Sequence, residues 1–75
     1  MKIIFSRHAK RRAKLYKIPE STIIDILTNM DPSQGKHEII EDVVGFKHPL
    51  KIIFFVKDDM ITVITTYPLK KGRKK

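Results

Sequence analysis

The chain of 75 residues has no cysteine and only three glycines. Without cysteine it has no disulfide framework and no thiolate chemistry, which is compatible with a reducing cytoplasm, where we expect the protein. The glycines stand at positions 35, 45 and 72, so the sequence has neither a G-x-G-x-x-G nor a P-loop motif and predicts no nucleotide cofactor. The longest apolar run, residues 52–56, is far below the roughly 20 residues that span a bilayer. Residues 1–6 lack an apolar segment of secretory length, so we expect no signal peptide. Among partners, a membrane is not expected.

Acidic residues are also few, because 8 Asp and Glu stand against 16 Lys and Arg, for a net charge of +8. This excess favours a polyanionic partner: nucleic acid first, an acidic protein second and an anionic membrane third. A plain soluble surface is the alternative interpretation. Asn29 and Gln34 are the only side-chain amides, and this scarcity together with abundant lysine resembles thermophile usage. Lysine enrichment alone would therefore supply part of the charge.

The hydrophobic pattern predicts one α+β domain over residues 1–69, with order β-α-α-β-β-β. Ser6 is a good helix N-cap, and Pro19 separates two helical patterns. After residue 36 the period changes to two, as in strands. We expect two helices on one face of a mostly antiparallel sheet, followed by a flexible basic tail at 70–75. The expected elements are a strand at 1–5, helices at 6–17 and about 20–30, and strands at 36–44, 50–57 and 60–67.

The first predicted helix has an unusual distribution of polar side chains. At about 100° per residue, its lysines gather on one side and Ala9, Ala13, Leu15 and Tyr16 on the other. His8 and Arg12 fall inside this second, apolar arc. Placing an imidazole and a guanidinium at the edge of a buried face costs desolvation energy, which suggests a site or a specific polar contact.

The residues on and near this helix are suited to metal-independent cleavage of RNA. His8 would act as general acid or base, because its unperturbed pKa lies near neutrality. Arg12 would bind the phosphate, and Tyr67, at the end of the last strand, would orient the phosphate or stack a base. Further contacts to nucleic acid are expected from basic and aromatic residues of the helix and tail: Arg11, Tyr16, Lys70, Lys71 and Arg73.

Each of these residues also has a purely structural interpretation. His8 could bond a nearby carbonyl, and Arg12 could pair with an acidic residue of the sheet, such as Glu38, Glu41 or Asp42. Tyr67 could be a packed aromatic at a strand end. A metal site is not expected, because the three histidines are widely separated and no H-x-x-x-H pair occurs.

The run Phe5-Ser6-Arg7-His8-Ala9, followed by Arg12, resembles the S-x-H-A-x-x-R helix of a prokaryotic domain-of-unknown-function family. The ending at 61–68 is similar to that family's terminal "vvTvY" strand. The family looks distantly related to RelE/ParE/BrnT toxins, which have a small barnase-like sheet. The resemblance implies metal-independent ribonuclease activity or a toxin-like role, with His8, Arg12 and Tyr67 at the matching positions. Tyr16 stands where relatives often have a second Arg.

The sequence therefore predicts a small RelE-like domain that binds RNA and cleaves it without metal. One alternative is a non-catalytic module of the same fold, which binds nucleic acid or is held by an acidic antitoxin-like protein. Another is a protein-interaction domain whose sheet edge accepts a partner strand.

Overall fold

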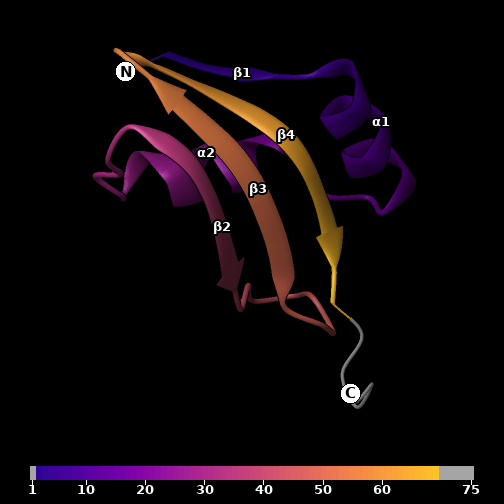
Figure 1. Cartoon of the computed structure of the whole chain (residues 1–75). Helices are drawn as coiled ribbons and strands as arrows, with labels where there is room; N and C mark the ends of the chain where they lie inside the picture. The colour runs from indigo at the N-terminus through magenta and orange to yellow at the C-terminus, as the bar shows by residue number, and fades with distance from the viewer. Residues whose placement is uncertain (1, 70–75) are drawn as a thin grey trace.

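A computed structural model describes residues 2–69, so Met1 and the predicted tail at 70–75 lie outside the described residues. The order β-α-α-β-β-β is confirmed (Figure 1). In chain order the elements are β1 (Lys2–Phe5), α1 (Arg7–Leu15), α2 (Glu20–Thr28), β2 (Gly35–Glu41), β3 (Leu50–Lys57) and β4 (Met60–Pro68).

The four strands form one sheet in the order β1-β4-β3-β2. The pairs β2–β3 and β3–β4 are antiparallel, as expected for consecutive strands joined by short connections. β1 pairs with β4 in parallel, so the sheet is mixed. The parallel pair is possible because α1, α2, β2 and β3 all lie between the two strands in the chain.

The core lies on one face of this sheet. Along β3, Leu50, Ile52, Phe54 and Val56 are buried, whereas the alternate residues are half-buried or exposed. Figure 1 shows α2 behind the sheet and α1 beside β4, where the short β1 ends. The buried residues of the helices and of the following turn join the same core: Ala9, Ala13, Ile18, Ile23 and Leu27.

Ser6 fastens the start of α1 to a bulge in β4. The pairing of β3 with β4 shifts at Ile53/Phe54, which leaves Ile64 as the extra residue of β4. The Ser6 hydroxyl donates to the Ile64 carbonyl at 2.9 Å and accepts from the Ala9 N–H at 3.0 Å. The Ser6 N–H also donates to the Val63 carbonyl at 2.9 Å. The predicted N-cap therefore also joins α1 to the sheet.

Three elements end earlier than the sequence pattern predicts. α1 stops at Leu15, because Lys17 has φ 57° and the Ile18 N–H donates to the Ala13 carbonyl at 2.8 Å, which closes a Schellman-type turn. α2 stops at Thr28. β2 stops at Glu41, where β3 begins opposite at Leu50, so residues 42–44 have no partner strand in the described part of the chain.

Two neighbouring threonines of β4 give a matched stability test. The buried Thr66 hydroxyl donates to the Lys51 carbonyl at 3.0 Å, whereas Thr65 Oγ1 is buried without a partner among residues 2–69. We expect Thr66→Val to lower the free energy of unfolding by about 1 kcal/mol, because a hydrogen bond is lost. Thr65→Val should be neutral or stabilising, since it removes an unsatisfied group. Urea denaturation of both variants checks this, and equal losses would contradict it.

Candidate nucleic-acid interface

The face of the sheet opposite the core carries a mixture of basic and apolar side chains. The strand registers place these side chains in rows that cross the sheet. No described helix covers this face, because both helices pack into the core on the other side. From one end of the sheet to the other, the rows are Ile40–Lys51–Tyr67, Glu38–Ile53–Thr65, Lys36–Phe55–Thr62–Ile4 and Lys57–Met60–Lys2.

Lys51 lies on this uncovered face in the inner strand β3, in the end row with Ile40 and Tyr67. Its Nζ lies 3.3 Å from Glu38 Oε1, and Tyr67 lies directly across the strand pair. The Glu38 carboxylate, aided by Tyr67, raises the pKa of Lys51 above its ordinary value. Lys36 and Lys57 on the same face are exposed. The face therefore carries one lysine held by an ion pair, Lys51, and two lysines exposed to solvent, Lys36 and Lys57.

Aromatic and aliphatic side chains lie between these lysines. Phe55, on the central strand β3, is 42% exposed, and Ile40 on β2 is 58% exposed. Tyr67 is half-buried. Exposed apolar area therefore lies beside the lysines on the face that no described helix covers.

α1 carries His8 and Arg12, the first two residues of the predicted cleavage site. Ala9 and Ala13 form the buried stripe of the helix. Lys10, on one side of this stripe, lines a hollow with Glu20 and Ile24 of α2. Because residues advance by about 100° along a helix, Arg12 lies on the other side of the stripe, away from α2. α1 packs beside β4, the strand that contributes Tyr67.

The structure corrects part of the expected apolar arc. Ala9 and Ala13 are buried as predicted, but Leu15 is 65% exposed and Tyr16 is also exposed. His8 is exposed rather than set at the edge of a buried face, so its imidazole bears little desolvation cost. The reason is that α1 packs on the sheet edge through small residues only, which leaves a narrow contact. Arg12 is half-buried.

The expected ion pairs of Arg12 do not form. Within residues 2–69 the side-chain ion pair is that of Lys51 with Glu38, so Arg12 pairs with none of Glu38, Glu41 and Asp42. Its guanidinium is therefore available to an external anion. Arg11 is exposed on the same helix. The other expected nucleic-acid ligands, Lys70, Lys71 and Arg73, lie outside the described residues.

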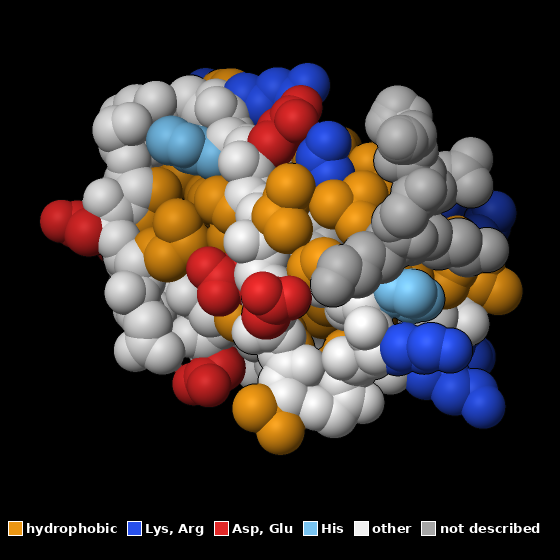
Figure 2. All heavy atoms as spheres, turned by 90° about the horizontal axis from the view of Figure 1, so that it is seen from below, with side chains coloured by type: hydrophobic (Ala, Val, Ile, Leu, Met, Phe, Trp, Pro, Cys, Tyr) orange, Lys and Arg blue, Asp and Glu red, His pale blue; other side chains and the backbone are white. Residues whose placement is uncertain are grey.

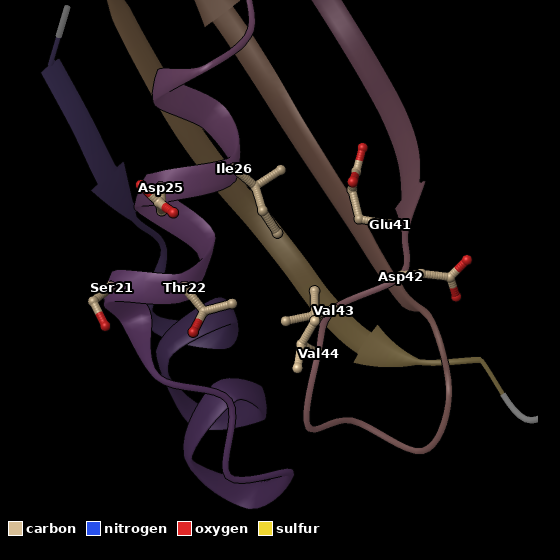
Figure 3. Close-up of a pocket in the computed structure, with 8 residues that line it drawn as sticks. All are labelled: Ser21, Thr22, Asp25, Ile26, Glu41, Asp42, Val43 and Val44. Carbon is tan, nitrogen blue, oxygen red and sulfur yellow. The ribbon is translucent and has the colours of Figure 1, made fainter.

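Another hollow lies elsewhere and has the wrong charge for a polyanion. It measures about 600 Å³ between α2 and the segment after β2, with Asp25, Glu41 and Asp42 at its rim (Figure 3). In the view from below, acidic side chains gather towards the left and centre, and many of the basic ones lie at the rim (Figure 2). Among the described side chains, no group of three His, Asp or Glu is placed to hold a metal ion.

Comparison of the chain with protein-family models, curated proteins and solved structures finds no match. The resemblance to RelE-like toxins therefore stays a prediction. Within residues 2–69, neither helix is long and apolar enough to cross a bilayer.

The site predictions lay on the first helix, on Tyr67 and on the basic tail, and they did not include Lys51, Phe55 and Glu38. A signal for two of them was present, because alternation over 50–57 places Lys51 and Phe55 on the same face of the strand. Glu38 gave no such signal, since its contact with Lys51 depends on the register between β2 and β3.

Proposed function

We propose that this protein binds single-stranded RNA on the uncovered face of its sheet. The observation that carries the proposal is the exposed Phe55 ring among the lysines of this face, with Tyr67 on the same side. Lysines neutralise backbone phosphates, and aromatic rings stack on unpaired bases. A duplex hides the faces of its bases, so this combination favours single strands.

Cleavage of the bound strand is assigned to the flank of α1. His8 Nε2 or Nδ1 would take the proton of a 2′-hydroxyl, whose oxygen then attacks the adjacent phosphorus. The bond to the 5′-oxygen breaks, and that oxygen takes a proton from a water molecule, which gives a 2′,3′-cyclic phosphate, a 5′-hydroxyl and a hydroxide that the protonated His8 neutralises. Arg12 would stabilise the charge on the phosphorane, and Tyr67 would orient the phosphate or stack a neighbouring base. Two observations support these roles: His8 is exposed, and Arg12 forms no ion pair within residues 2–69.

Binding is tested with a fluorescent oligouridine titrated with wild-type protein and with Phe55→Ala. We expect the variant to bind about tenfold more weakly, because one base loses its stacking partner. The wild-type association constant should also fall steeply with salt concentration. Val44→Ala, at a fully exposed site next to the acidic hollow, is the matched control and should bind as the wild type does. Equal affinity for Phe55→Ala and the wild type would overturn the proposed surface.

Cleavage is tested separately, by incubating RNA with wild-type protein, His8→Ala or Arg12→Ala in EDTA. We expect loss of cyclic-phosphate products in both variants, with binding retained by His8→Ala. Equal cleavage by His8→Ala and the wild type would remove His8 from the mechanism. RNA left intact by the wild type would reject the catalytic part and leave the binding surface standing.

An acidic partner protein is the second candidate for this surface. Three exposed residues on the uncovered face are aliphatic or thioether side chains: Ile4, Ile40 and Met60. Such side chains neither neutralise phosphates nor stack on bases as aromatic rings do. An acidic protein with an apolar stripe would form ion pairs with the lysines and pack against these apolar residues. Salt-insensitive or absent binding of oligouridine would favour this function.

A further inference from the structure

The free edge of β2 offers backbone groups that the proposed RNA site does not use, and it borders the uncovered face at Lys36 and Glu38. The sheet has two outer strands, and β1 is only four residues long and followed directly by α1. β2 has seven residues, contains no proline and pairs with β3 without any irregularity. Within residues 2–69 no strand pairs with its outer side (Figure 1). Its outward N–H and C=O groups are a template for another strand.

The charges on this edge match a second copy of the same edge. Proteins often protect a free edge with charges that repel another chain. Here Lys36 and Glu38 have opposite signs and stand two residues apart, on the same face of the strand. In a symmetric antiparallel pair centred on His37, Lys36 lies opposite the partner's Glu38, and Glu38 lies opposite the partner's Lys36.

Other symmetric registers lack this match. Centring the pair on Lys36 or on Glu38 places two like charges directly opposite each other. Centring it on Ile39 places Glu38 opposite an isoleucine. The existing contact of Glu38 does not interfere, because Lys51 lies against Oε1, which leaves Oε2 for the partner's Lys36. Only the register centred on His37 satisfies both charges.

We propose that two copies of this chain pair through β2, in antiparallel orientation about His37, to form a continuous eight-stranded sheet. The strands gain backbone hydrogen bonds that the isolated edge lacks, and two ion pairs fix the register. The two uncovered faces then lie side by side on one surface. The dimer does not depend on the proposed RNA binding, and it is tested without RNA.

The absence of cysteine from the chain allows a direct test of the register. We would mix Lys36→Cys and Glu38→Cys proteins under mild oxidation and measure disulfide-linked dimers by non-reducing electrophoresis and mass spectrometry. In the proposed register the two cysteines are directly opposite, within disulfide range, and the second Lys–Glu pair stays intact. Each variant alone places its cysteines about 8 Å apart, beyond disulfide range. We therefore expect the mixed dimer to form at least tenfold faster than either self-linked dimer.

A charge-swap series measures the same contact in solution by sedimentation equilibrium. We expect Lys36→Glu and Glu38→Lys each to weaken dimerisation at least tenfold, and the double variant K36E/E38K to recover it. Lys57→Glu, on the same face but outside the β2 edge, should leave dimerisation unchanged. A wild-type protein that remains monomeric at millimolar concentration would overturn the dimer. Cross-links that form equally fast in all samples would overturn the register.

Discussion

Replacing Phe54 with alanine should lower the free energy of unfolding by about 3–5 kcal/mol, the largest effect we expect from a single substitution. Phe54 has no solvent exposure, lies on the central strand β3, and stacks on His37 with ring centroids 5.2 Å apart. Truncation removes the apolar contact of the ring and leaves a cavity in the core. Since a domain of this size has a free energy of unfolding of only about 4–11 kcal/mol, the substitution would remove a large part of it.

Thermal and urea unfolding followed by circular dichroism would measure this loss. Phe54→Leu is the matched control, because it keeps most of the apolar volume and should cost under about 1.5 kcal/mol. If alanine and leucine destabilised the protein equally, the cavity argument would be wrong and the stacking on His37 would carry the effect.

Replacing Ser6 with alanine should lower the free energy of unfolding by about 2 kcal/mol. The hydroxyl makes two hydrogen bonds, one from the Ala9 N–H and one to the Ile64 carbonyl at the bulge. Loss of a helix N-cap costs about 1 kcal/mol, and loss of the bond to the carbonyl costs about 1 kcal/mol more. The same change loosens α1 from β4, the junction that holds His8 and Arg12 beside the sheet.

Two further substitutions separate the roles of Ser6. Ser6→Thr keeps both hydrogen bonds and should be close to wild type in denaturant unfolding. Ser6→Asp still caps the helix but has no hydroxyl to donate to Ile64, so it should fall between threonine and alanine. Full stability of Ser6→Asp would mean that the bond to the bulge contributes nothing.

The candidate site was only partly predictable from the sequence. The helical periodicity correctly predicted that Ala9 and Ala13 are buried. It failed for Leu15 and His8, because the width of a buried helix face depends on how closely the sheet approaches it. The contact between Lys51 and Glu38 joins two strands, and no spacing within either strand encodes it.

Local patterns determined the number, type and order of the elements in this chain. Three of these patterns act over only a few residues and can be recognised in the sequence itself. They are the Ser6 N-cap, the helix break at Pro19 and the change of period after residue 36. The tertiary structure alone decided that β1 lies parallel to β4. It also decided that, within residues 2–69, no helix covers one face of the sheet and no strand pairs with the outer side of β2. These features depend on pairing between residues far apart in the chain, where many registers are compatible with the same local pattern and only packing against the shared core selects one.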